Sequence, residues 1–291
     1  MIKNLKVHLF AFFTVLLWGS GFPFTRIIDG QIGSYGLGAI RCILAAVIFA
    51  VIGIVTGMRK PFCKKDLLWF FAAGITGFSL YFIFFNLGLE TLDSSTGSII
   101  CATTPISTSI GVYLIYKERI NKTGWISMFC AFAGVVILLM WDSGISVSIG
   151  AVWMFISATL FAAYNIITRK LSELGYTAME IVTYAAVAGA VQLVFFLPSG
   201  ISDMLTADTQ AVMACIYLGV FPSAIAYCLW AMAISLADRT SIATNYLFIN
   251  PLIATVIGII MLHEVPGLGT VAGGAIIIIS VIVFSKKGCS Q

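Results

Sequence analysis

The chain has 291 residues, of which 60% are hydrophobic and only 10% are charged, and its mean hydropathy is +1.06. Soluble domains carry about 25% charged residues, and a water-soluble chain of this length could not bury so much apolar surface in one core. The composition therefore excludes an ordinary soluble protein. The net charge of +4 reflects the placement of basic loops rather than nucleic-acid binding.

Ten apolar runs follow one another along the chain, and each is long enough to cross a bilayer as a helix. About 20 residues at 1.5 Å each span a hydrocarbon core roughly 30 Å thick. The sequence thus predicts an all-α membrane protein with ten transmembrane helices. The predicted helices are 7–28, 35–57, 66–90, 94–116, 123–141, 148–170, 177–197, 210–235, 239–262 and 268–285.

The first run follows Lys3 and Lys6, as the apolar region of a signal peptide would. Its apolar stretch is too long for such a peptide, and no small-residue cleavage site closes it. We therefore expect a membrane helix of the mature protein.

Basic residues indicate which side of the membrane each loop faces. With the N-terminus in the cytoplasm, 14 of the 16 Lys and Arg residues fall in cytoplasmic segments, and only Arg26 and Arg41 fall toward the outside. Because cytoplasmic loops are enriched in Lys and Arg, this distribution predicts that both termini are cytoplasmic.

One spacing occurs twice in the chain. Pro105 is followed thirteen residues later by Glu118, and Pro251 is followed thirteen residues later by Glu264. The two copies lie 146 residues apart, which is about half the chain. This spacing predicts two copies of one unit.

Each unit holds five helices, and an odd number inverts the second copy in the bilayer. The predicted repeats are residues 1–143 and 144–291. Asp93 and Asp238 are matching N-cap candidates, and Gly74-Ile-Thr-Gly matches Gly219-Val-Phe-Pro.

Helix-breaking residues lie at matching depths in the two copies. Pro105 and Pro251 are about 18–20 Å along their helices, near the midplane, and Pro222 lies near the middle of the eighth helix. Breaks at matching places in inverted halves predict a substrate site at the midplane.

A set of short motifs accompanies the repeat. They are Trp18-Gly19-Ser20, Arg41 with Leu44-Ala45-Ala46, the two Pro-to-Glu helices, and Gly124, Gly134, Gly273 and Gly274. With these motifs the chain resembles the EamA family of the drug/metabolite transporter superfamily, over its whole length. The resemblance implies a small-metabolite transporter of the cytoplasmic membrane, with helices 1–4 and 6–9 around a central cavity and helices 5 and 10 at the periphery. It names no substrate.

None of the twelve acidic residues falls in the middle of a predicted helix. Glu118 and Glu264 lie about 20 Å beyond their prolines, so we expect them to tie helix ends to neighbours rather than to carry protons. The cargo is then neutral or zwitterionic. Arg41, near the outer end of its helix, is expected to snorkel or pack between helices, with contact to an anionic group of the cargo as the alternative.

Uncharged polar residues in the apolar runs are better candidates for the substrate site. A buried amide without a partner is costly, so these side chains are expected to face the bundle interior; the alternative is an interhelical hydrogen bond. Proline frees the carbonyls of Cys101 and Leu247, for a substrate ammonium or for a neighbouring donor. The polar candidates are Asn86, Thr103, Thr104, Asn165, Asn245 and Asn250.

Deep aromatic residues complete the predicted site. A tyrosine offers a hydroxyl and a stacking face, which suits an amino-acid-like cargo. Tyr81 and Tyr227 are 146 residues apart and occupy matching helices. The other deep aromatic candidates are Trp18, Tyr164 and Trp230.

The sequence holds no enzyme signature. His8 and His263 sit at membrane edges, and no dinucleotide, nucleoside-triphosphate or zinc-protease motif occurs. We expect no enzyme activity, no cofactor, no metal and no nucleic-acid partner, and a monomer or weak homodimer in lipid. The predicted function is export of amino acids or related small metabolites by alternating access; the alternatives are a multidrug or nucleotide-related exporter, and a scaffold or sensor without flux.

Overall fold

A computed structural model describes residues 2–58, 63–117, 120–141, 148–236 and 245–287. These residues form α-helices with short 3-10 and π segments, and no β-strand occurs among them, which confirms the predicted all-α class. The helices are α1 (Ile2–Ile28), α2 (Ser34–Thr56), α3 (Leu67–Gly74), α4 (Leu80–Leu89), α5 (Ser94–Cys101), α6 (Thr104–Tyr116), α7 (Lys122–Trp141), α8 (Ile149–Glu173), α9 (Ala178–Leu193), α10 (Leu197–Thr206), α11 (Thr209–Val220), α12 (Ala226–Leu236), α14 (Asn250–Leu262) and α15 (Leu268–Lys287).

Several of the apolar runs each consist of two helices joined by a short turn, and together the two helices make one membrane span. Among the described residues, seven helical stretches are long and apolar enough to cross a membrane. Three further apolar helices, Lys122–Ile137, Asn250–Leu262 and Leu268–Phe284, are shorter. The chain is therefore a multi-pass membrane protein, and the count of ten spans stays a prediction.

Helix ends recur at the spacing found in the sequence. α14 begins and ends 146 residues after α6, and α15 begins and ends 146 residues after α7. Both α6 and α14 carry a proline in the first turn, and each ends at a residue with positive φ, Lys117 at 58° and His263 at 55°. The two halves of the chain thus repeat one helical pattern.

Two π turns interrupt equivalent helices. One turn (η2, Ile75–Ser79) joins α3 to α4, and the other (η4, Phe221–Ile225) joins α11 to α12, again 146 residues further on. The predicted match of Gly77 with Pro222 is wrong by one residue, because this register pairs Gly77 with Ser223. Wide turns of this kind occur frequently at functional sites.

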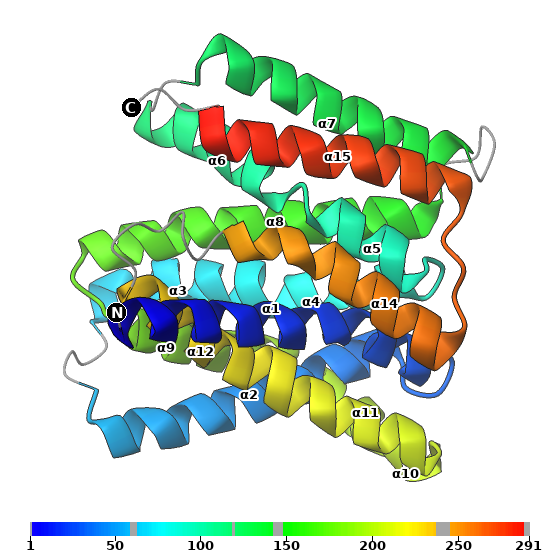
Figure 1. Ribbon diagram of the computed structural model, residues 1–291. Coiled ribbons are helices and arrows are strands. Elements are labelled where there is room, and N and C mark those ends of the chain that lie inside the picture. The colour runs from blue at the N-terminus through cyan, green and yellow to red at the C-terminus, as the bar shows by residue number, and fades with distance from the viewer. Residues whose placement is uncertain (1, 59–62, 118–119, 142–147, 237–244, 288–291) are drawn as a thin grey trace.

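Helices α7 and α15 lie side by side at one edge of the molecule, at the top of Figure 1. A Cβ on Gly134 of α7 would lie 2.9 Å from the carbonyl oxygen of Gly273 in α15, so only glycine permits this close approach. The largest buried cluster lies elsewhere, where α2, α4, α8, α9 and α12 meet. The pair is therefore peripheral, as the family resemblance implies.

Candidate functional site

Large aromatic side chains meet where α1, α4, α8 and α12 converge. The Trp18 ring lies 5.3 Å from Trp230 and 5.5 Å from Tyr227, measured between ring centroids. Phe161 extends the cluster, with centroids 6.2 Å from Trp18 and 5.1 Å from Tyr81. Four of the predicted aromatic residues are thus brought together with Phe161.

Tyr164, the fifth predicted aromatic residue, stacks on Phe161 at 5.5 Å and lies 6.5 Å from Tyr227. It also covers the η2 turn, because its ring occupies the space that a side chain on Gly77 would need. We call Trp18, Tyr81, Phe161, Tyr164, Tyr227 and Trp230 the aromatic cluster.

The two π turns hold the aromatic cluster through their backbone carbonyls. Trp18 Nε1 donates a hydrogen bond to the carbonyl of Pro222 at 3.1 Å, and Tyr227 Oη donates to the carbonyl of Gly77 at 3.3 Å. Each bond joins an aromatic ring of one helix to the wide turn of another. The breaks predicted from glycine and proline therefore position aromatic side chains.

Two of the predicted polar residues, Thr103 and Thr104, bind backbone carbonyls close to them in the chain. Thr103 Oγ1 donates to the Ile100 carbonyl, and Thr104 Oγ1 donates to the Cys101 carbonyl, both at 2.7 Å. The carbonyl of Cys101 that Pro105 frees thus accepts a hydrogen bond from within the chain, which is the second of the two alternatives, a neighbouring donor.

Asn165 contacts the neighbouring helix α6, where its Nδ2 donates to Thr108 Oγ1 at 3.3 Å. This bond is the interhelical contact that the sequence left open as an alternative to substrate binding. The side chains of Asn245 and Pro105 lie outside the described residues.

Asn250 differs from these polar residues. Its Oδ1 is buried and has no hydrogen-bond partner among the described residues. It faces α1, because a Cβ on Gly19 would lie 3.0 Å from this oxygen. Pro251 is buried beside it in the first turn of α14. A buried acceptor without a donor is costly, so Asn250 is the polar candidate best suited to a ligand.

Asn86 is buried and binds a cation. Its Oδ1 accepts from Arg41 Nη1 at 3.0 Å, and its Nδ2 donates to the Ser34 carbonyl at 3.0 Å. Arg41 Nε donates to Ser223 Oγ at 3.2 Å, and its guanidinium lies 4.3 Å from the centroid of Phe82. Arg41 is only 4% exposed, so of the two expected positions it takes the one packed between helices and does not snorkel to the membrane surface.

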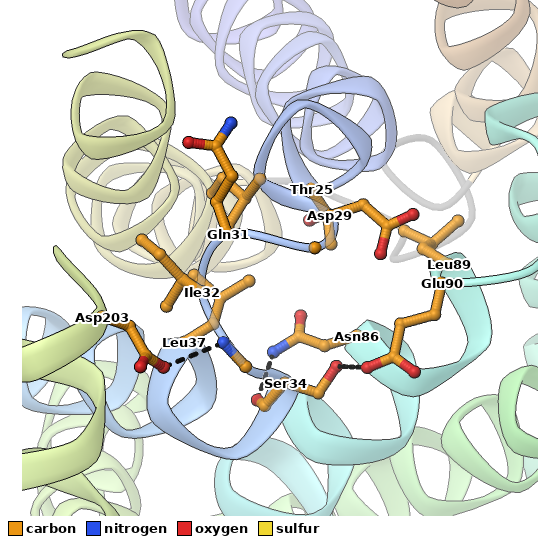
Figure 2. A pocket seen from close by; sticks show the side chains of 13 residues that line it. Thr25, Asp29, Gln31, Ile32, Ser34, Leu37, Asn86, Leu89, Glu90 and Asp203 are labelled. Carbon is orange, nitrogen blue, oxygen red and sulfur yellow. Dashed lines mark hydrogen bonds between the residues drawn. The ribbon is translucent and has the colours of Figure 1, made fainter. Parts of the chain in front are cut away.

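A pocket of about 470 Å³ lies where the loop after α1 meets the ends of α2, α4 and α10. Figure 2 shows Asn86 forming part of its wall, with Asp29, Glu90 and Asp203 around it. All three carboxylates are bound, since Ser34 Oγ donates to Glu90 at 2.6 Å, the Gly33 amide donates to Asp203 at 3.1 Å, and Arg26 Nη1 donates to Asp29 at 3.2 Å. The pocket therefore combines an acidic rim with an amide wall.

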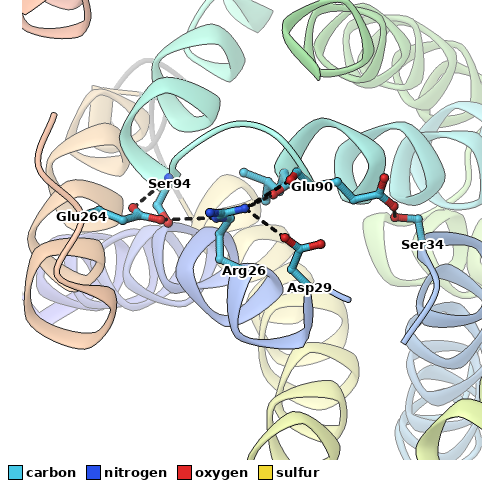
Figure 3. Close-up of polar contacts among 7 residues, drawn as sticks. Arg26, Asp29, Ser34, Glu90, Ser94 and Glu264 are labelled. Carbon is cyan, nitrogen blue, oxygen red and sulfur yellow. Dashed lines mark hydrogen bonds and ion pairs between the residues drawn. The ribbon is translucent and has the colours of Figure 1, made fainter. Parts of the chain in front are cut away.

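Glu264 ties helix ends together at the same end of the molecule. Its Oε2 accepts from the Ser94 amide at 2.9 Å, and its Oε1 lies 3.5 Å from Arg26 Nε, an ion pair without a hydrogen bond (Figure 3). Arg26 also contacts Asp29 at 3.2 Å. The structural role predicted for Glu264 is confirmed, while Glu118 lies outside the described residues.

Carboxylates also cap helices at the membrane ends. Asp93 Oδ1 accepts from the Thr96 amide at 2.6 Å, which confirms the predicted N-cap; Asp238 lies outside the described residues. Asp208 caps α11 in the same way, and hydrogen bonds from the Ala211 amide and then the Gln31 side chain lower the pKa of its carboxyl.

Sequence reasoning missed three contributors to this region. Phe161 lies three and four residues from Tyr164 and Asn165, a spacing that places all three on one helix face. Ser223 could have been found by aligning the two π turns. The interior position of Arg41 had no local signal, because the same helix position could face lipid or protein.

Comparison with known proteins places the chain among transporters. A profile described as the EamA-like transporter family matches residues 5–140 and 148–286. A probable terminal-alkyne amino-acid exporter of Streptantibioticus cattleyicolor is 29% identical, covering 94% of this chain and 91% of that protein. An uncharacterized transporter of Archaeoglobus fulgidus is 28% identical, covering 98% and 99%.

A solved crystal structure shares the fold. It matches with a TM-score of 0.64 at 17% identity, covering 95% of this chain and 97% of that one. The fold described above therefore occurs, nearly complete, in a second protein.

Proposed function

The chain belongs to the EamA-like transporter family, and from this premise we propose that it exports amino acids or related neutral or zwitterionic metabolites. In this proposal ten helices form two inverted repeats in the cytoplasmic membrane, with both termini in the cytoplasm. The two repeats rock against each other and expose a central site to each side in turn.

The observation that carries the proposal is the aromatic cluster held by the two π turns. Its members come from both repeats, so a movement of one repeat against the other would open or close the space between them. Aromatic faces attract an ammonium group and an apolar side chain alike. The name of the 29% identical relative, a probable amino-acid exporter, supports the same substrate class.

The polar part of the proposed site consists of Asn86 and Asn250. Asn250 supplies a buried acceptor to which no described residue donates, and such an acceptor suits an ammonium or another N–H group. Asn86 also lines the pocket of about 470 Å³ described above. Thr103, Thr104 and Asn165 belong to the proposal as neighbours of the site, with their hydrogen bonds already made inside the protein.

Counter-flow in proteoliposomes tests this function. The purified chain should exchange labelled amino acids, and Tyr81→Ala should lower the flux at least about tenfold while folded yield stays near wild type, because the substituted ring belongs to the proposed site. Phe132→Leu is the matched control, because Phe132 of α7 is 61% exposed. Its flux should stay within about twofold of wild type, since surface changes usually have small effects.

Other outcomes point to other functions. Flux of cationic drugs or nucleotide precursors but not of amino acids would favour the multidrug or nucleotide-related exporter. No flux across a broad metabolite panel, with the protein folded, would favour a scaffold or sensor and overturn the proposal. A flux that depends on the proton gradient would contradict the expectation that the acidic residues carry no protons during transport.

A further inference from the structure

Arg41 is a buried cation without a buried anion beside it. The nine acidic residues that the structure describes all bind other groups: Asp29 binds Arg26, Asp66 binds Tyr176, Glu90 binds Ser34, Asp93 binds Thr96, Glu173 binds Arg169, Glu180 binds Thr177, Asp203 binds Gly33, Asp208 binds Ala211 and Gln31, and Glu264 binds Ser94 and Arg26. The other three, Glu118, Asp142 and Asp238, lie outside the described residues, and the sequence places them at ends of predicted helices.

A charge in this position is unfavourable for the folded protein alone. Arg41 lies seven residues into α2, about 10 Å along the helix, and is 4% exposed. Ionisable residues inside membrane segments are costly, and they mark substrate or ion pathways. The charge of a guanidinium in such a place would be neutralised by an anion that binds from outside the chain.

The surroundings hold the guanidinium in one orientation. Nε and Nη1 donate to Ser223 and Asn86, both neutral acceptors, and the rings of Phe82 and Phe85 lie 4.3 and 5.5 Å from its carbon. No hydrogen bond joins its second terminal nitrogen to a described residue. A guanidinium fixed in this way is suited to a carboxylate, which it can bind through two parallel hydrogen bonds.

Asn86 connects this cation to the pocket described above. Asn86 lines that pocket, and its Oδ1 accepts a hydrogen bond from Arg41 Nη1. Ser223, the second holder, belongs to the η4 turn whose Pro222 carbonyl receives Trp18. Arg41 is therefore linked both to the pocket and to the helix break that supports the aromatic cluster.

We propose that Arg41 binds the carboxylate of the transported substrate and makes the transporter selective for carboxylate-bearing amino compounds. The inference rests on the proposed function. The carboxylate supplies the missing negative charge, while the aromatic cluster and Asn250 receive the ammonium and the side chain. Only the loaded protein then has a compensated charge at Arg41.

Matched acids and amides test the proposal in proteoliposomes. The probes are L-leucine with L-leucinamide and L-phenylalanine with L-phenylalaninamide, which differ only in the carboxylate. Wild type should take up each acid at least about tenfold faster than its amide, the size of effect that charge-assisted hydrogen bonds give. Arg41→Gln should reduce this preference to within about twofold, and Arg41→Lys, which keeps the charge but not the fork, should retain part of it.

Arg169→Gln is the matched control, because it removes a cation paired with Glu173 at the half-exposed end of α8; its acid preference should equal that of wild type. If wild type takes up acid and amide equally, the role of Arg41 is overturned while the proposed export function stands. This comparison uses wild type alone, so it does not depend on whether any variant folds. An undiminished acid preference in Arg41→Gln also overturns it. If none of the four compounds is taken up, the proposed amino-acid export is overturned, and this inference with it.

Discussion

At the scale of single residues, the candidate site depends on small side chains that let large ones approach. Gly77 lies under the Tyr164 ring, and its carbonyl receives the Tyr227 hydroxyl. Gly19 lies under Asn250 and Ile253 in the same way. In both places the absent Cβ permits contact between helices that carry the site, so glycine here determines where functional side chains lie.

Gly77→Ala should destabilise the protein and lower its flux. The added Cβ would lie 2.6 Å from Tyr164 Cε2, so the ring must move. Overpacking of this kind costs about 1–3 kcal/mol, which thermal unfolding in detergent would show as a lower midpoint.

Gly21→Ala serves as the comparison for this change, because its added Cβ would lie 3.7 Å from Pro222, an ordinary contact. Its midpoint should stay within the range of a neutral substitution. Equal midpoints for the two variants would contradict the tight contact between Gly77 and Tyr164.

At the scale of helices and turns, breaks and caps occur where the chain must change direction or offer a backbone group. The π turns present carbonyls to Trp18 and Tyr227, and prolines begin α6 and α14. Helix N-termini at the membrane ends are capped by Asp93, Asp208 and Thr177. The caps and the turn carbonyls satisfy polar groups that lipid could not satisfy, and a proline in the first turn of a helix has no N–H that would need a partner.

Asp208 should make α11 sensitive to acid. Its lowered pKa comes first from the Ala211 amide and then from Gln31, so the folded state favours the ionised carboxyl. This stabilisation is complete above the ordinary aspartate pKa of about 3.9 and disappears as the pH falls through the lower folded-state pKa.

Asp208→Asn keeps an acceptor for the cap but cannot ionise. The advantage of wild type over Asp208→Asn in unfolding midpoint should therefore be largest near neutral pH and shrink below about pH 4. An advantage that grows on acidification would show that the carboxyl is not stabilised in its charged form. The measurement is a series of thermal unfolding curves across pH.

At the scale of the whole molecule, the helices divide into a bundle that carries the candidate site and a peripheral pair. α7 and α15 pack on each other through Gly134 and Ile277 at the edge seen in Figure 1. The aromatic cluster and Arg41 belong to the bundle. The pair should therefore contribute to stability without contributing to selectivity.

Gly134→Leu tests this division. The new side chain would meet Ile277 and the Gly273 carbonyl, so unfolding should become easier by about 1–3 kcal/mol. Flux per folded molecule should stay within about twofold of wild type, and the preference for acids over amides should be unchanged. A changed preference would place the pair in contact with the transport path.

The sequence alone was enough for the class of the protein and the plan of its helices. Apolar length and composition predict membrane helices because the bilayer core requires them, and the 146-residue spacing predicts the repeat that the helix ends then display. The deep aromatic residues could be found for the same reason, since each lies in an apolar run whose depth follows from helical rise.

Only the tertiary structure decided which of these residues meet and which are already satisfied. It placed Arg41 inside the bundle, assigned Thr104 to the carbonyl that Pro105 frees, and gave the Asn250 oxygen no donor from the part of the chain that is described. Such outcomes depend on which face of a helix meets its neighbour. In a membrane helix that is apolar all round, no polar face marks the buried side, so orientation emerges from packing between helices distant in sequence.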